Sequence, residues 1–186
     1  MNQKHIIITI FLFQLLIQTK SQQFSENLSP NSLGFEKEKL THLHFYFHEV
    51  ISGRPPTVVQ VAEAATTNSS KTGFGTTYVA DNPLTVGPEL TSKIVGRGQG
   101  MSASADLNDF GYLWVFNLVF GEGKYNGSTL SLLGRNAVLA PVREMSIVGG
   151  TGFFRFARGY ALTKTQFSNP SNGDSTVEYD VFVIHY

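Results

Sequence analysis

The stretch VREMSIVGGTGFFRFARGYA, residues 142–161, decides the fold class, because its glycines fit either a nucleotide-binding loop or a turn between strands. A dinucleotide site needs the pattern G-x-G-x-x-G immediately before a helix. Gly150 and Gly152 fill the first two positions, but Arg155 stands at the third. The aromatic residues that follow favour a strand over a helix. We therefore predict two strands joined by a glycine-rich turn, the second over residues 153–165.

The same β-type composition extends over most of the chain. Runs rich in β-branched and aromatic residues alternate with glycine, proline, asparagine and aspartate, and no long amphipathic helix is evident. The runs cover residues 41–50, 57–64, 74–80, 92–105, 111–120, 128–134, 143–149, 153–165 and 176–186. Eight or nine short strands with tight turns predict an all-β barrel or sandwich. Asn126-Gly127, between two apolar runs, is the strongest hairpin-turn signal.

Alternation along HLHFYFHE, residues 42–49, separates two faces. The histidines and Tyr46 share one face, and Phe47 and Glu49 lie on the other with further apolar residues. If the apolar face points inward, the Glu49 carboxylate enters an apolar interior, where its pKa is raised unless a cation pairs with it. Such a group is a functional candidate. The alternative is that Glu49 ends the strand and faces solvent.

The same pattern in REMSIVGG places Arg143 on an inward, apolar face and Glu144 on the opposite one. Arg143 is therefore a second functional candidate. The alternative is a structural ion pair with Glu144 or with another carboxylate at the rim. Arg155 and Arg158 are expected on opposite faces of the following strand, and we interpret at least one of them as structural.

The spacing of the histidines in residues 42–48 raises the question of a metal site. HLHFYFHE contains H-x-H, four residues and then Glu49, which partly matches the metal motif of cupins. No second motif with a late histidine follows, and His185 is the only other histidine after residue 48. We therefore predict no metal and no cofactor. Exposed strand histidines or an oligomer contact are the expected roles.

The first 21 residues predict a secretory signal peptide. Lys4 precedes an apolar run from Ile6 to Ile17, which is too short to span a bilayer, and small residues follow it. Residues 22–38 are polar and predict a flexible leader. Residues 39–186 then form one predicted β-barrel domain, long enough to bury a core without disulfides.

Charge and sequons narrow the expected partners. Beyond residue 21, 12 basic and 14 acidic residues remain, because Lys4 and Lys20 account for the other two of the 14 basic residues. This balance predicts no binding to nucleic acid or to an anionic membrane. The chain has no cysteine. Asn68 and Asn126 begin N-x-[ST] sequons that we predict to be glycosylated surface sites, whereas Pro30 disfavours the sequon at Asn27.

Five segments, in order, resemble the plant dirigent family. They are LTHLHFYFHEVISG (40–53), DNPLTVGPELTSKIVGRGQG (81–100), YNGSTLSLLGRN (125–136), VREMSIVGGTGFFRFARGYA (142–161) and VEYDVFVIHY (177–186). The resemblance covers nearly all of residues 39–186. It implies an eight-stranded antiparallel β-barrel similar to allene oxide cyclase, assembled as a homotrimer and secreted to the apoplast, in which Arg143 lines a pocket.

The resemblance also implies a function. Dirigent proteins bind phenoxy radicals of monolignols such as coniferyl alcohol, which a separate laccase or peroxidase generates, and impart stereoselectivity on their coupling to lignans. Some relatives resemble pterocarpan synthases, which dehydrate an isoflavanol through a quinone methide. A phenolic-binding protein of the cell wall or of defence, without turnover, is a third alternative. Holding reactants in one orientation suffices for selectivity.

The predicted site combines both lines of reasoning. Glu49 and Arg143 are the predicted catalytic residues, and Glu49 stands where the family usually has aspartate. Substrate-binding positions are Phe47, Ser102, Ser104 and Asn136. Ser102 and Ser104 stand where lignan-forming members of the family tend to have tyrosines. Where this chain has GRN, pinoresinol-forming members have GAD. Asn136 therefore replaces a second acidic residue, and its amide cannot donate the proton that the carboxylic acid would donate.

Overall fold

The structure is a computed structural model that describes residues 24–25, 27–35 and 37–186. It divides into two units, Met1–Gly34 and Phe35–Tyr186. The described part of the first unit contains a short 3-10 helix, η1 (Pro30–Leu33). The predicted signal peptide lies outside the described residues, and the boundaries of the leader remain a prediction.

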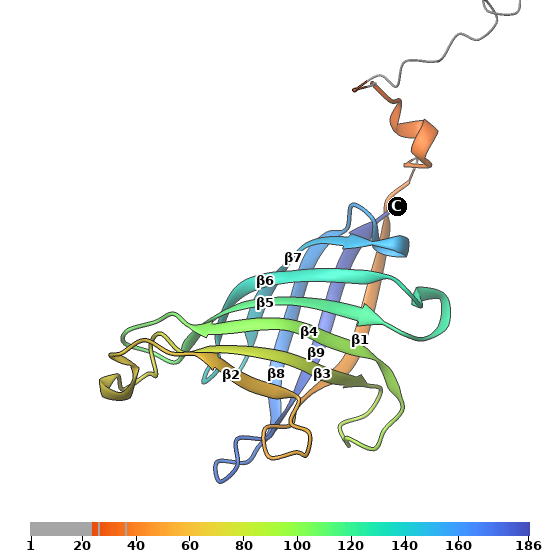
Figure 1. The fold of residues 1–186 in the computed structure, drawn as a ribbon. Helices are drawn as coiled ribbons and strands as arrows, with labels where there is room; N and C mark the ends of the chain where they lie inside the picture. Colours follow the sequence, from red (N-terminus) through yellow and green to blue (C-terminus); the bar gives the residue numbers. More distant parts are fainter. Residues whose placement is uncertain (1–23, 26, 36) are drawn as a thin grey trace, which may run out of the picture. The chain divides into compact units, whose positions relative to one another are not determined.

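The second unit is an antiparallel sheet that closes on itself (Figure 1). Its strands are β1 (Lys39–Glu49), β2 (Val58–Ala62), β3 (Thr77–Thr85), β4 (Ile94–Ser104), β5 (Gly111–Phe120), β6 (Thr129–Ala137), β7 (Arg143–Thr151), β8 (Arg158–Ser168) and β9 (Ser175–His185). Their order is β1-β9-β8-β7-β6-β5-β4-β3-β2. No helix in the described part of the chain is long and apolar enough to cross a membrane.

Closure depends on how β1 and β2 divide one edge of β3. β1 pairs with β9 along its whole length, from Lys39 opposite His185 to Glu49 opposite Ser175. It also pairs with the end of β3, where Tyr46 and Phe47 face Thr85 and Leu84. β2 pairs with the beginning of the same edge. Eight strands therefore close the barrel, and β2 is an additional strand that pairs with the remaining part of the β3 edge. This confirms the predicted eight-stranded antiparallel barrel.

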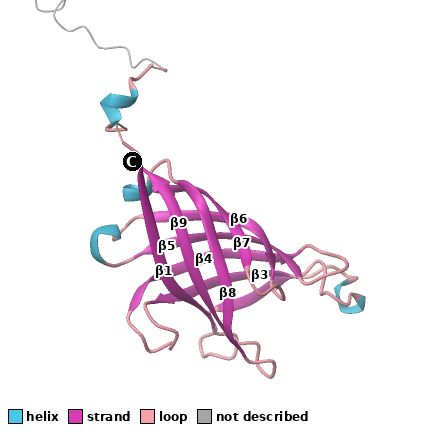
Figure 2. Ribbon diagram, turned by 180° about the vertical axis from the view of Figure 1, so that it is seen from behind, coloured by secondary structure: helices cyan, strands magenta, loops and turns pink. Residues whose placement is uncertain are grey.

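The barrel interior is filled at one end and open at the other. Inward side chains fill the closed end with a continuous apolar core that includes Phe45, Phe120 and Phe154. On β4, two strands from β1 in the closed order, the inward position beside Phe47 is Gly98, where a Cβ would lie 2.2 Å from the Phe47 ring. The glycine therefore makes room for this ring inside the barrel. Figure 2 shows the strands from the opposite side.

Two connections differ from their sequence expectations. The predicted strand 153–165 begins only at Arg158, because 3-10 helix η4 (Gly152–Phe154) and Phe156, with φ +60°, turn the chain first. Buried Phe154 anchors this turn in the core. Arg155 therefore lies in the connection and not on a strand, whereas Arg158 pairs with Glu38.

The hairpin between β5 and β6 is present, but Asn126-Gly127 does not form a two-residue turn. The connection runs from Gly121 to Ser128 and includes 3-10 helix η3 (Gly123–Tyr125). Tyr125 stacks on Phe154, with ring centroids 5.0 Å apart, which holds the longer loop against the end of the barrel. Another 3-10 helix, η2 (Thr67–Ser69), lies between β2 and β3.

Candidate functional site

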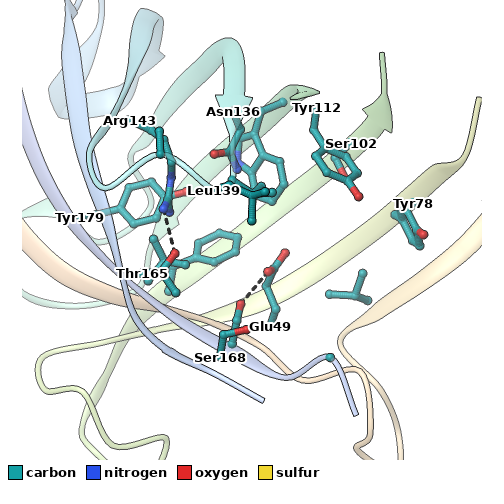
Figure 3. Close-up of a pocket in the computed structure, with 18 of the residues that line it drawn as sticks. Glu49, Tyr78, Ser102, Tyr112, Asn136, Leu139, Arg143, Thr165, Ser168 and Tyr179 are labelled. Atoms are coloured by element: carbon teal, nitrogen blue, oxygen red, sulfur yellow. Dashed lines mark hydrogen bonds between the residues drawn. The ribbon is translucent and has the colours of Figure 1, made fainter. Parts of the chain in front are cut away.

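A cavity of about 560 Å³ occupies the open end of the barrel (Figure 3). Side chains of all nine strands and residues of the adjoining loops form its wall. They are Phe47, Glu49, Ile51, Val58, Tyr78, Ser102, Tyr112, Trp114, Asn136, Val138, Leu139, Ala140, Pro141, Arg143, Thr165, Ser168, Gly173, Ser175, Val177 and Tyr179. The volume and the mainly apolar wall with a few polar groups are typical of small-molecule sites.

The floor of the cavity is aromatic. Phe47 stacks on Tyr179 with ring centroids 5.4 Å apart, and it lies 6.1 Å from the Trp114 ring. The inward positions of β1, β5 and β9 bring these three rings together. Burial, and then the nearby Glu49 carboxylate, raise the pKa of Tyr179, so that its phenol stays neutral. An aromatic floor of this kind suits an aromatic ligand.

Glu49 faces the cavity, as strand alternation predicts, and the alternative of a solvent-facing strand end is wrong. Ser175, its partner across β1 and β9, donates a hydrogen bond of 2.7 Å from Oγ to Glu49 Oε2. Burial raises the pKa of the Glu49 carboxyl, whereas the Ser175 hydrogen bond and the positive charge of Arg143 lower it; the net direction is upward. The group is therefore a candidate for proton transfer to and from a bound molecule.

Arg143 is 5% exposed and also faces the cavity. Its Nη1 donates to Thr165 Oγ1 at 2.8 Å, and its Nε has no hydrogen-bond partner in the described residues. Burial lowers the pKa of the guanidinium, and Tyr179 and Glu49 raise it. Glu144 lies exposed on the other face. The alternative of an ion pair with Glu144 is therefore wrong, and no carboxylate in the described part of the chain lies within ion-pair distance of Arg143.

The remaining predicted substrate-binding residues divide into two groups. Phe47, Ser102 and Asn136 line the cavity. Asn136 is 5% exposed, and its Oδ1 has no partner among the described residues. Ser104 is buried but does not line the cavity, because its hydroxyl donates to the Thr72 carbonyl at 3.0 Å. Ser104 therefore fixes the loop before β3.

Sequence reasoning missed four aromatic wall residues, namely Tyr78, Tyr112, Trp114 and Tyr179. The buried indole Nε1 of Trp114 has no hydrogen-bond partner in the described chain. Burial, and then nearby Tyr78 and Glu49, raise the pKa of Tyr112. Period-two alternation in GYLWVFNLVF and TVEYDVFVIHY would have placed three of these side chains inward.

A latch at the rim joins two loops. Asp174, just before β9, accepts hydrogen bonds at Oδ1 from the backbone N–H groups of Ile51 and Ser52, at 2.8 and 2.9 Å. The Ser52 hydroxyl donates to the other carboxylate oxygen. These hydrogen bonds lower the pKa of Asp174. Because Ile51 lines the cavity, the latch fixes one apolar side of its mouth.

The strand histidines have different environments. His42 and His44 are exposed and form 2.8 Å contacts with Asp180 and Glu178. The expectation of exposure is wrong for His48, which is buried between the hydroxyls of Thr85 and Thr176. His44, Glu178 and Asp180 bring possible ligand atoms within 4.8 Å of one another. The contacts among these side chains account for the cluster, and the absence of a metal remains a prediction.

The predicted glycosylation sites lie on the surface. Asn68 belongs to η2, and Asn126 follows η3; both side chains are exposed. Neither residue lines the cavity. Their positions fit modification without obstruction of the site, and glycosylation itself remains a prediction.

Comparisons with known proteins agree with this architecture. The family model described as Dirigent-like protein matches residues 40–184. The chain is 54% identical over 182 residues to Dirigent protein 21 of Arabidopsis thaliana. The alignment covers 97% of this chain and 96% of the relative. It is 48% identical over 180 residues to Pterocarpan synthase 1 of Glycyrrhiza echinata, covering 96% of each.

A solved structure is also similar. The structure of the pterocarpan synthase dirigent protein GePTS1 superposes with a TM-score of 0.80 at 51% sequence identity, and covers 87% of this chain and 99% of that one. The similarity thus spans the whole barrel and its cavity.

Proposed function

Because the chain belongs to the dirigent family, we propose that it directs the stereoselective coupling of phenoxy radicals that a separate laccase or peroxidase generates. The observation that carries the proposal is the cavity. Trp114, Asn136 and Arg143 line it, and each carries one buried polar atom, Nε1, Oδ1 and Nε respectively, without a partner in the described chain. Buried polar atoms without partners are costly, which supports their use by a ligand with oxygen substituents.

Coupling requires orientation and little covalent chemistry from the protein. Two phenoxy radicals form one C–C bond between them, and each ring becomes a quinone methide. A side-chain hydroxyl then adds to each methide carbon, and its proton passes to the ring oxygen. Arg143 can donate a hydrogen bond to that oxygen, and Glu49 can carry the proton. A product ratio of about 20 to 1 requires a difference of only about 2 kcal/mol between competing transition states.

The raised pKa of Glu49 favours a second candidate, the dehydration of an isoflavanol. A protonated Glu49 can donate its proton to the leaving hydroxyl as the C–O bond breaks. The ring phenol loses its proton to solvent, and a neutral quinone methide forms as water leaves. A second hydroxyl then adds to the methide carbon and closes the ring, while its proton passes to the ring oxygen and solvent reprotonates Glu49. The pterocarpan synthases among the relatives support this candidate.

A chiral product assay with and without added laccase tests both candidates. Enantiomeric excess in the coupling of coniferyl alcohol that depends on laccase supports the first. Dehydration of an isoflavanol without laccase supports the second. Racemic coupling together with no dehydration would overturn both and leave a phenolic-binding protein without turnover.

Self-association is also part of the proposal, and an apolar stripe on the outer barrel surface supports it. Five exposed side chains are successive cross-strand partners over β2–β6, namely Val59, Val79, Met101, Val115 and Leu133. A continuous apolar surface of this kind fits contact with a second copy. The family resemblance implies three copies. Light scattering after size exclusion tests this, and Met101→Glu should shift the mass toward that of one chain.

Secretion to the apoplast completes the proposal. It rests on the predicted signal peptide and on family membership. N-terminal sequencing of the extracellular form should find a start near residue 22. Asn68→Gln and Asn126→Gln should each remove one glycan from that form, as seen by its mobility on a gel. A retained apolar segment at the N-terminus would contradict secretion through cleavage.

A further inference from the structure

Tyr78 and Tyr112 bring two phenol groups into the cavity from strands β3 and β5. Tyr78 is the cross-strand partner of Ser102, and Tyr112 is the partner of both Ser104 and Asn136. The small side chain of Ser102, which also lines the cavity, leaves space beside Tyr78. Neither tyrosine hydroxyl has a hydrogen-bond partner within the described ranges. Both can therefore bind an oxygen atom of a ligand.

The positions of the strands place Tyr78 opposite Arg143. In the closed order of eight strands, β3 and β7 are four positions apart in either direction. Tyr78 on β3 and Arg143 on β7 therefore lie on opposite walls of the barrel, as Figure 3 shows. Asn136 and its cross-strand partner Tyr112 lie between these two walls. A ligand that contacts both walls has to span the cavity.

We propose that Tyr78, together with Tyr112, forms a second polar pole that binds an oxygen substituent on the far ring of a two-ring phenolic ligand, while Arg143 binds the oxygen of the first ring. This inference rests on the proposed class of ligand, a phenolic compound, and adds its size and the spacing of its oxygens. Phe47 and Trp114 lie between the poles and support the rings.

The chemistry of the poles differs, and this gives the ligand a direction. Arg143 offers only donors, so it selects an oxygen that accepts a hydrogen bond. A tyrosine hydroxyl both donates and accepts, so the second pole accepts a hydroxyl or an ether oxygen. Burial raises the pKa of Tyr112, which keeps its phenol neutral and able to donate. A one-ring phenol can occupy only one pole at a time.

The single tryptophan allows a direct binding test. Trp114 is the only tryptophan in the chain and lines the cavity, so its fluorescence reports occupancy without any turnover. Two probes are titrated, coniferyl alcohol as a one-ring phenol and an isoflavanol with a hydroxyl on each aromatic ring. The variants are Tyr78→Phe and Tyr112→Phe. Tyr160→Phe, on the exposed outer surface of β8, is the matched control.

Each cavity variant should weaken binding of the isoflavanol about threefold to tenfold, the effect of one neutral hydrogen bond. Binding of coniferyl alcohol should change less than about twofold, because it retains the Arg143 pole. Tyr160→Phe should change neither. Equal effects on the two probes, or no effect on the isoflavanol, would overturn the second pole.

The binding test also separates this inference from the proposed function. If wild-type protein catalyses neither reaction but Tyr78→Phe selectively weakens the isoflavanol, the function fails and the second pole stands. If wild-type protein is active but Tyr78→Phe binds the isoflavanol normally, the second pole fails and the function stands. Unchanged thermal unfolding of each variant, followed by circular dichroism, excludes misfolding as the cause.

Discussion

Glu49 and Ser175 are cross-strand partners at the open end of the barrel, and the serine hydroxyl fixes Glu49 Oε2 at 2.7 Å. The other carboxylate oxygen, Oε1, has no hydrogen-bond partner in the described part of the chain and remains available to a ligand. One hydrogen bond thus orients the carboxyl group without saturating it. This arrangement suits a group that exchanges a proton with a bound molecule.

Glu49→Gln should retain the fold, because the amide oxygen can still accept the Ser175 hydrogen bond. The formation rate of the selective product should fall about a hundredfold or more, because the amide cannot exchange the proton. Glu144→Gln, on the exposed face of β7, is the control and should have no effect. Chiral chromatography under identical conditions measures both. An unchanged product ratio and rate in folded Glu49→Gln would remove the catalytic role and leave binding geometry as the mechanism.

The pH dependence of stability follows from the raised pKa of Glu49, whose ordinary value is 4.5. A carboxyl group with a higher pKa in the folded state stabilises the fold fully below pH 4.5, and this contribution is lost as the pH rises through the folded-state pKa. The unfolding free energy of wild type should therefore fall relative to that of Glu49→Gln as the pH increases from 4 to 8. Chemical denaturation at each pH measures the difference. A constant difference would contradict the raised pKa.

Asn136→Leu should stabilise the protein and impair its function. The substitution removes a buried Oδ1 that has no partner in the described chain, and relief of such an atom contributes about 1–3 kcal/mol. It also removes a polar contact for the ligand. Thr163→Val is the matched control, because the Thr163 hydroxyl is likewise buried without a described partner but does not line the cavity. This control should gain stability and keep its product ratio. Calorimetry and the chiral assay together test the pair.

Asp174→Ala should loosen the mouth of the cavity. It removes the acceptors for Ile51 N, Ser52 N and the Ser52 hydroxyl, so amide hydrogen exchange between β1 and β2 should accelerate. KM should rise about threefold while kcat changes less than twofold, because the proton-transfer groups are untouched. Asp109→Ala, in the exposed loop before β5, is the control. A fall in kcat with unchanged KM would contradict a role limited to the rim.

Local patterns predicted the inner surface of the strands better than the connections. Alternation with a period of two correctly placed Phe47, Glu49 and Arg143 in the barrel interior, because a strand buried on one face has no other solution. The start of β8 was predicted five residues too early, because Phe154 is buried by a turn and not by a strand. Aromatic composition does not distinguish these two cases.

Local patterns did not identify the hydrogen-bond partners of the inward polar residues. Thr165, on the strand next to Arg143, accepts a hydrogen bond from its guanidinium, and the Thr72 carbonyl accepts one from the Ser104 hydroxyl. These contacts join residues 22 and 32 positions apart, and they depend on the pairing of β7 with β8 and on the loop before β3. The sequence therefore indicated which side chains point inward, but not which of them remain free for a ligand.

The pairing of the first strand with the last has a consequence for biosynthesis. Glu49 and Ser175 are 126 residues apart, so at typical translation rates β1 leaves the ribosome roughly 6 to 25 s before its partner β9 exists. Throughout that interval the edge of β1 that pairs with β9 has no partner, and an unpaired strand edge is an aggregation hazard. The strand that carries the proposed acid thus depends on the strand that is synthesised last.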